Sequence, residues 1–322
     1  MLRGFSCWMT LLLLAVASPA AAQNSAPQKR IALTFDDVPN GNGPWLSDDE
    51  RTARIVAELD KASVTQAAFF VNPSRLVAND KSTSEEIARA ERGSAHVVAY
   101  VAAGHVIANH SYAHPALGAT ATDAYLADID LAQQWLNGRE GVRYWFRYPY
   151  LDEGRKDKVK RDAVRVGLKD RGLMNGYVTV DGVDWKFESL AADAVKAGKP
   201  IDRAALGQLY VEQHLGAANF FDTLAVKTLG RSPAHVMLLH ETDMAAFYIG
   251  DLVRALRADG WTIITADEAF ADPISKFAPD VPWAQGTRTE LLAWEKGLPA
   301  PRDYPRNGEA VVEKLFQDKV LK

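Results

Sequence analysis

The stretch "IALTFDDVPNG", residues 31–41, decides how the rest of the chain is interpreted. Its first five residues, Ile31 to Phe35, form strands readily and are mostly apolar, and they run directly into two adjacent carboxylates, Asp36 and Asp37. Two like charges at the end of a buried strand are unfavourable unless something compensates them. The stretch therefore predicts positive charge beside the pair, supplied by the chain or by a bound ion.

Six more strand-like segments follow, and helical patterns separate most of them. The strands are expected at 66–71, 104–110, 143–149, 176–181, 235–240 and 261–265. The helices are expected at 47–62, 80–104, 121–136, 155–172, 186–229 and 244–260, the first with Ser47 as its N-cap. This alternation predicts an α/β fold of parallel βαβ units. Seven strands, with no glycine-rich nucleotide motif after any of them, favour a (β/α) barrel, complete or incomplete, over an open nucleotide-binding sheet.

Composition limits the possible partners. The chain has 322 residues, 48% of them hydrophobic, which suffices for one large core. It carries 37 basic and 41 acidic residues, a net charge of −4, and no basic stripe, so nucleic acid is not expected as a partner.

The two ends of the chain differ from its centre. Residues 1–22 have the pattern of a signal peptide: Arg3, an apolar run "WMTLLLLAVA" and a small-residue cleavage site before Gln23. This predicts export to the periplasm or the exterior, without stable membrane insertion after cleavage; the alternative is an uncleaved anchor. The single cysteine, Cys7, lies in that segment, so disulfides and cysteine nucleophiles are not expected beyond it.

Residues 30–271 are predicted to form the catalytic domain, and the Pro- and charge-rich residues 272–322 a C-terminal surface extension.

Reactive side chains recur where the predicted strands end. In a parallel barrel the carboxyl ends of the strands meet on one face, and the loops there carry the chemistry. The residues at these ends are therefore predicted to share one site: Asp36, Asp37, His110, Arg147, Asp184, Trp185 and His240.

The segment "HSYAH" carries a possible metal site. His110 and His114 are four residues apart, a spacing that on one helical turn lets both imidazoles bind the same ion. A third ligand is needed, and Asp36 or Asp37 could supply it. Two imidazoles and one carboxylate suit zinc, cobalt, nickel or iron better than magnesium. The other aspartate then needs its own cation, for which Arg147 is the natural candidate.

His240 has two possible interpretations. At the end of a very apolar strand it could simply be a buried core histidine. Asp184 favours the other interpretation, because a carboxylate beside an imidazole orients the ring and raises its pKa, as a general acid requires.

These residues resemble the polysaccharide deacetylases of carbohydrate esterase family four, also called the NodB-like homology domain. The resemblance extends over about residues 30–270 and depends on five motifs in the family's order: "TFDD", "HSYAH", "RYPY", "DGVDW" and "LLH". It implies a distorted (β/α) barrel of about seven strands. It also implies removal of N- or O-acetyl groups from an acetylated glycan such as chitin, peptidoglycan or xylan, with a divalent metal, zinc in the first place and cobalt or nickel as alternatives.

The resemblance also implies roles for single residues. Asp36 would be the general base and Arg147 would hold it in place. Asp37 would bind the metal together with the two histidines His110 and His114.

The remaining roles concern the other half of the predicted site. His240 would be the general acid, tuned by Asp184, and the backbone N–H of Tyr150 would bind the oxyanion. Trp185 and Leu238 would line the pocket for the acetyl methyl group.

Departures from the family pattern fall in loops. Val38 stands where the family usually has glycine, residues 40–49 form an insert, "LDEG" follows Tyr150, and the helical region 186–229 is long. Aromatic residues near these loops, Trp45 and Tyr148, are predicted to stack on sugar rings. The altered loops leave two alternatives open: the same site acting on a small non-peptide amide, or an inactive glycan-binding barrel.

Overall fold

The computed structural model describes residues 1, 4 and 28–322, so all of the predicted signal peptide except residues 1 and 4 lies outside the described residues. Eight strands form one sheet in which every pairing is parallel, in the order β6-β4-β3-β2-β1-β8-β7, with β9 pairing the beginning of β1. The strands are β1 (Lys29–Val38), β2 (Ala68–Val71), β3 (Val106–Asn109), β4 (Val142–Phe146), β6 (Met174–Asn175), β7 (Val180–Asp181), β8 (Ala234–His240) and β9 (Trp261–Ile263).

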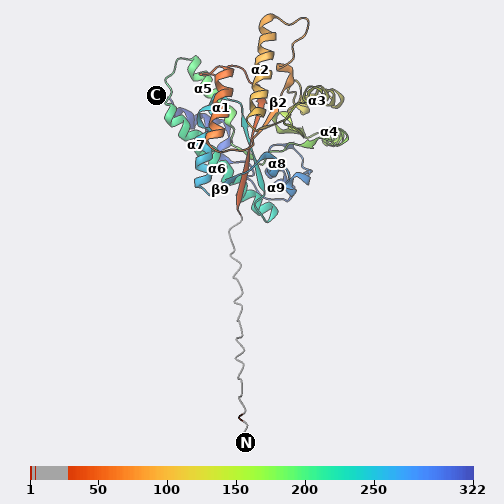
Figure 1. Cartoon of the computed structure of the whole chain (residues 1–322), viewed down its shortest axis with the longest axis vertical. Helices are drawn as coiled ribbons and strands as arrows, with labels where there is room; N and C mark the ends of the chain where they lie inside the picture. The colour runs from red at the N-terminus through yellow and green to blue at the C-terminus, as the bar shows by residue number, and fades with distance from the viewer. Residues whose placement is uncertain (2–3, 5–27) are drawn as a thin grey trace.

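Helices surround this sheet, with α1 and α7 packed together on one side and α3 and α4 on the other (Figure 1). The helices are α1 (Asp48–Lys61), α2 (Ser84–Ala102), α3 (Thr122–Leu136), α4 (Lys158–Asp170), α5 (Asp184–Lys196), α6 (Arg203–Leu229), α7 (Asp243–Ala258), α8 (Ala266–Phe270), α9 (Arg288–Glu295) and α10 (Glu309–Lys319). Among the described residues, none of these helices is both long and apolar enough to cross a bilayer.

The predicted elements are present, with two differences. All seven predicted strands have a counterpart, but three short strands were not predicted, because such short segments have no detectable periodicity: β5 (Asp152–Arg155), β6 and β10 (Ala284–Gln285). The helical region 186–229 is two helices, α5 and α6, with a break at residues 197–202. Ser47 caps α1 in a capping box with Glu50, as expected from the sequence.

Strand β1 explains why its end is charged. Its side chains alternate between two faces. Ile31, Leu33 and Phe35 pack in the large core beneath the outer helices, whereas Ala32 belongs to the second core cluster, on the opposite face. Asp36 continues the face of Ala32, so the alternation directs its carboxylate toward the interior of the half-barrel.

The barrel is distorted because its two end strands do not pair. Strands β6 and β7 follow one another in the chain, yet β6 bonds to β4 and β7 bonds to β8. The chain crosses this seam at residues 176–179, where the N–H of Gly176 donates to Phe146 O and that of Thr179 donates to Val236 O. The fold is therefore the distorted, incomplete (β/α) barrel that the sequence predicts.

The segment 272–322 is not the surface extension expected from its composition. Val312, Phe316 and Val320 are buried in the main core. Strand β10 (Ala284–Gln285) pairs with β5 (Asp152–Arg155), and the N–H of Arg288 donates to Val178 O at the seam. The prediction was wrong because Pro and charged residues dominate the count, while a few apolar side chains at helical spacing do the packing.

Candidate active site

Asp36 lies at the carboxyl end of β1, directly opposite His240 in the register of the neighbouring strand β8. Its side chain is almost completely buried, and its Oδ1 accepts a hydrogen bond of 2.8 Å from Arg147 Nη1. Arg147 is buried as well, and its other bonds go to Thr34 Oγ1 and to Gly176 O. The predicted partner of one aspartate is therefore confirmed, and the ion pair is held in place by the backbone at the seam.

Asp37 faces the two histidines of the predicted metal site. Its Oδ1 lies 3.4 Å from His110 Nε2 and 3.1 Å from His114 Nε2. Burial alone would raise the pKa of Asp37, but the two imidazoles beside its carboxylate and the charges of His110 and His240 hold that pKa well below its ordinary value. The three side chains offer ligand atoms that all lie within 4.8 Å of one another.

These donors fit a divalent metal. Asp37 Oδ1 is buried and accepts no hydrogen bond from the described residues. His110 Nδ1 lies 3.0 Å from Arg147 O, so that nitrogen carries the proton and leaves the lone pair of Nε2 directed at Asp37. Two imidazole nitrogens and one carboxylate oxygen, with no thiolate, form a set typical of a hydrolytic zinc-type site.

The backbone around the site adopts an uncommon conformation. Asp37, Ser111, His114 and Tyr150 all have positive φ, between 59° and 67°. The histidine pair consequently lies on a loop and not on the helical turn that the spacing suggested. Such strained residues concentrate at functional sites, where the surrounding structure holds them in place.

His240 is paired with Asp184 on the other side of the site. Asp184 is fully buried at the first position of α5; its Oδ1 lies 2.7 Å from His240 Nδ1, and its Oδ2 accepts the backbone N–H of His240 at 2.7 Å. Burial lowers the pKa of His240, but the charge and hydrogen bond of Asp184 outweigh burial and raise it to about 10. His240 is therefore oriented and charged, and is not a plain core histidine.

These groups border one cleft of about 500 Å³. Three further residues, predicted to contact the substrate or the oxyanion, also line this cleft: Tyr150, Trp185 and Leu238. The ring of Tyr150 packs edge-on against that of His114, with centroids 4.6 Å apart, and 58% of Tyr150 remains exposed. The structure thus brings together ten of the predicted residues in or directly beside the cleft: Asp36, Asp37, His110, His114, Arg147, Tyr150, Asp184, Trp185, Leu238 and His240.

The structure contradicts the predicted stacking roles of Trp45 and Tyr148. Asp243 accepts the backbone N–H of Trp45 at 2.8 Å, and the Trp45 ring packs against Phe247 on α7, outside the cleft. Tyr148 is buried against Phe146, with ring centroids 5.0 Å apart. Because Arg147 points inward, its neighbour in the extended chain must face the other way.

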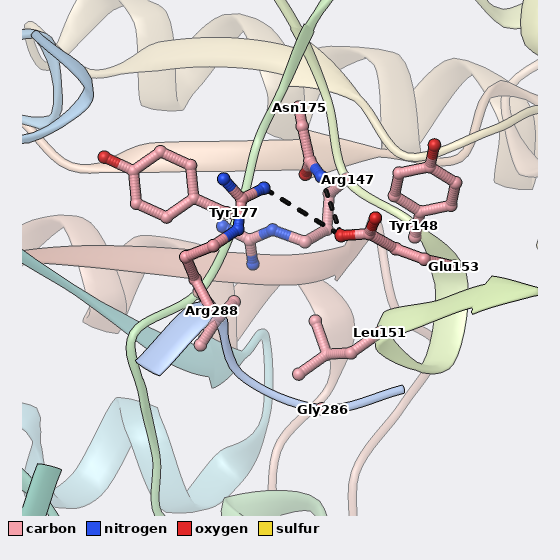
Figure 2. Close-up of a pocket in the computed structure, with 9 residues that line it drawn as sticks. Arg147, Tyr148, Leu151, Glu153, Asn175, Tyr177, Gly286 and Arg288 are labelled. Atoms are coloured by element: carbon pink, nitrogen blue, oxygen red, sulfur yellow. Dashed lines mark hydrogen bonds and ion pairs between the residues drawn. The ribbon is translucent and has the colours of Figure 1, made fainter. Parts of the chain in front are cut away.

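Behind Arg147 lies a separate small cavity of about 10 Å³, room for one water molecule (Figure 2). Glu153, the third residue of the "LDEG" departure, lies beside it and accepts from Asn175 at 2.8 Å, with Arg288 Nη2 at 3.9 Å (Figure 2). Arg165 also donates to Glu153. The departure thus has a structural role: it supplies a buried carboxylate that balances the arginines behind the site.

Sequence reasoning missed four residues that line the cleft: Leu151, Asp181, Gln285 and Gly286. Asp181 ends β7, and its burial, reinforced by the charge of Asp184, raises its pKa to about 6 although it accepts the N–H of Val183. Asp181 is the first residue of the "DGVDW" motif. Its position at the end of a predicted strand could have identified it as a residue of the site. Gln285 and Gly286 come from the C-terminal segment, for which the sequence offered no signal.

Comparison with known proteins gives one family. Residues 23–170 match the family model described as polysaccharide deacetylase. A peptidoglycan-N-acetylglucosamine deacetylase from Bacillus cereus is 28% identical over 165 residues, which cover 51% of this chain and 49% of that protein. The chain thus matches about half the length of this curated relative.

Solved structures resemble the fold. A polysaccharide deacetylase from Bacillus cereus aligns with a TM-score of 0.51 at 17% identity, covering 74% of this chain and 92% of that chain. A chitin deacetylase from Colletotrichum lindemuthianum aligns with a TM-score of 0.49 at 19% identity, covering 79% and 93%. The family match over residues 23–170 agrees with the resemblance carried by the five motifs, and the likeness to the solved structure shows the fold.

Proposed function

We propose that this protein is a metal-dependent hydrolase that removes acetyl groups from an acetylated polysaccharide or peptidoglycan. The observation that carries the proposal is the convergence of three units on one cleft: the Asp37–His110–His114 donor set, the Asp36–Arg147 pair and the Asp184–His240 pair. Together they provide a metal site, a base and an acid, the groups that hydrolysis of an acetamide or acetate ester requires.

Asp36 acts as the general base. Arg147 donates to one carboxylate oxygen and keeps that oxygen fixed, while the other oxygen lies 3.6 Å from His110 Nε2 at the edge of the metal site. The Asp36 carboxylate is thus placed to take the proton of a water molecule that attacks the acetyl carbonyl carbon.

A zinc-type ion held by Asp37, His110 and His114 would polarise the acetyl carbonyl and acidify the attacking water. The backbone N–H of Tyr150, in the loop beside His114, donates to the carbonyl oxygen as negative charge develops on it. Trp185 and Leu238 exclude water from the acetyl methyl group on the opposite side.

His240 acts as the general acid. Asp184 accepts the hydrogen bond of Nδ1–H, so Nε2 is the nitrogen that gives its proton to the departing amine or alcohol. Loss of that proton completes cleavage of the C–N or C–O bond, with acetate as the second product.

Substrate and location are part of the proposal. The Bacillus cereus relative is named for N-acetylglucosamine in peptidoglycan, and this supports an acetylated envelope glycan as substrate here. The N-terminal pattern of residues 1–22 supports export to the periplasm or the exterior.

The test is acetate release by purified protein that has been stripped with a chelator and reloaded with zinc or cobalt. The panel contains N-acetylated chito-oligosaccharides, peptidoglycan fragments and acetylxylan. Metal-restored activity is expected in the wild type and not in Asp36→Asn. Asp222→Asn is the matched control, because Asp222 pairs with His235 away from the cleft. Reloaded wild type that releases no acetate from any of these glycans contradicts the proposal.

A further inference from the structure

The carboxylate that orients His240 stands at the end of a tight turn. Residues 181–184 lead from strand β7 into helix α5, and Asp184 is the first residue of that helix. Val183, directly before it, has a φ of 51°, in the left-handed region that a β-branched side chain rarely adopts. Such a backbone persists only where its surroundings hold it in place. The position of the Asp184 carboxylate therefore depends on what holds this turn.

Two hydrogen bonds fix the beginning of the turn at Asp181. Its carboxylate accepts the N–H of Val183 at 2.8 Å, and its backbone oxygen accepts from Asn307 Nδ2 at 3.1 Å. Asn307 belongs to the C-terminal segment and is itself held by helix α6, because Gln213 Nε2 donates to its Oδ1 at 3.1 Å. The turn is thus connected to helix α6 through Asn307.

Helix α6 also contacts the turn directly, through the ring of His214. This imidazole is fully buried, and its Nδ1–H donates to Tyr210 O at 2.7 Å, one turn earlier in the helix. Its Nε2 has no hydrogen-bond partner within residues 28–322, so the ring acts on the turn through packing. A Cβ atom on Gly182 would lie 2.5 Å from His214 Cδ2. The ring therefore fills the space beside Gly182 and prevents the turn from shifting toward α6.

His214 and Asn307 lie outside the cleft, since neither is among the residues that line it. Helix α6 is the larger part of the long helical region in which the sequence departs from the family pattern, and Asn307 lies in the C-terminal segment. These two segments meet at the turn that carries Asp184. The contacts give both segments a common task, which is to hold that turn.

We propose that His214 and Asn307 are positioning residues for the general acid. They hold the turn at residues 181–184 and so keep the Asp184 carboxylate 2.7 Å from His240 Nδ1. This proposal rests on the proposed function, because it takes His240 as the group that protonates the departing amine or alcohol. It assigns helix α6 and the C-terminal segment a role in that proton transfer.

Two substrates with different leaving groups separate a misplaced acid from a damaged fold. An N-acetylated sugar releases a basic amine that must receive a proton, whereas 4-nitrophenyl acetate releases a phenolate that is stable without one. A variant in which Asp184 is displaced should therefore lose activity on the sugar and keep most of its activity on the nitrophenyl ester. A partly unfolded variant loses activity on both substrates by the same factor.

The test compares His214→Ala, His214→Phe and Asn307→Ala with the wild type, each reloaded with zinc. His214→Phe is the conservative variant, because phenylalanine keeps a ring beside Gly182. Phe221→Ala is the matched control: Phe221 is an equally buried ring on α6, about two turns further along the helix. Acetate release from an N-acetylated chito-oligosaccharide and hydrolysis of 4-nitrophenyl acetate give kcat/KM for each variant.

His214→Ala is expected to lower kcat/KM for the oligosaccharide by roughly ten- to hundredfold, since small displacements of a reacting group have effects of that size. Its kcat/KM for 4-nitrophenyl acetate should stay within about threefold of the wild type. Asn307→Ala should change the two values in the same direction, and His214→Phe should stay close to the wild type. Phe221→Ala should alter both substrates equally.

An NMR titration of His240 in metal-free protein is the second readout. A displaced carboxylate stabilises the imidazolium less, so the pKa of His240 should fall by about one unit in His214→Ala and stay unchanged in Phe221→Ala. Equal losses on both substrates, together with an unchanged His240 titration, would overturn the positioning role. If the wild type releases no acetate from the glycan, the proposed function fails. The titration then decides alone: a shift in His214→Ala supports the positioning role, and no shift overturns it.

Discussion

Replacing Asp184 with asparagine tests the acid assignment most directly. Asparagine has the shape of aspartate, and its oxygen can still accept the backbone N–H of His240. Its NH2 group then faces His240 Nδ1, so the change removes the charge and the acceptor for that nitrogen. Asp184 is fully buried, and its contact with His240 Nδ1 measures 2.7 Å. An opposite charge at such a distance shifts a pKa by about one to three units.

The pKa of His240, about 10 in the wild type, should therefore fall by about one to three units in Asp184→Asn. Each unit corresponds to about 1.4 kcal/mol, so the pair contributes about 1.4 to 4 kcal/mol to the free energy of unfolding. The sign follows from the raised pKa: the contribution is complete below the ordinary histidine value and disappears as the pH rises through about 10.

The assay is an NMR titration of labelled histidine in metal-free protein, with kcat/KM against pH as the second readout. The alkaline limb of the rate profile should move to lower pH together with the titration. Asp222→Asn is the control, because it removes the carboxylate beside His235 and should leave His240 unchanged. A His240 titration that does not move in Asp184→Asn would refute the argument that this carboxylate sets its pKa.

Three further predictions concern stability and metal binding. Arg147→Met leaves the buried Asp36 charge uncompensated and should cost about 3 to 5 kcal/mol in urea unfolding; Asp36→Asn added to it should restore part of that loss, and additive losses would contradict the pairing. Zinc at 100 times its dissociation constant should stabilise the wild type by about 2.7 kcal/mol, and an equal stabilisation of Asp37→Asn would exclude Asp37 as a ligand. Deletion of residues 272–322 removes Val312, Phe316 and Val320 from the main core and should abolish cooperative thermal unfolding; a sharp transition in the truncated chain would show that the core does not need them.

The sequence was sufficient to predict the strands and the charged residues at their ends, because short-range patterns encode both. The strand ends could be found because apolar runs stop abruptly at charged residues, and one charged residue at each end was enough to place Asp36, His110 and His240 on one face. The aromatic residues could not be placed in this way. Whether a ring faces a cleft or the core depends on its neighbour's direction, as for Tyr148, or on a distant anchor, as for the Asp243 carboxylate that holds the backbone of Trp45.

Long-range contacts account for the rest. Gln285 reaches the site only because residues 284–285 add a strand to 152–155, more than a hundred positions earlier in the chain. No local pattern encodes such a pairing, and the Pro-rich composition around it even suggested the opposite. The left-handed conformation of Tyr150 was likewise invisible in the sequence, since tyrosine does not favour it.

The open seam of the barrel gives the molecule an order of assembly. The strands that carry Asp36, His110, Arg147 and His240 are all made before residue 241, but the seam between β6 and β7 stays uncovered until Arg288 has emerged. During synthesis from the N-terminus, the segments that carry the proposed acid, base and metal ligands are therefore complete before the residues that form the last side of the cleft. Chains that end before residue 285 therefore lack the two C-terminal residues that line the cleft, Gln285 and Gly286.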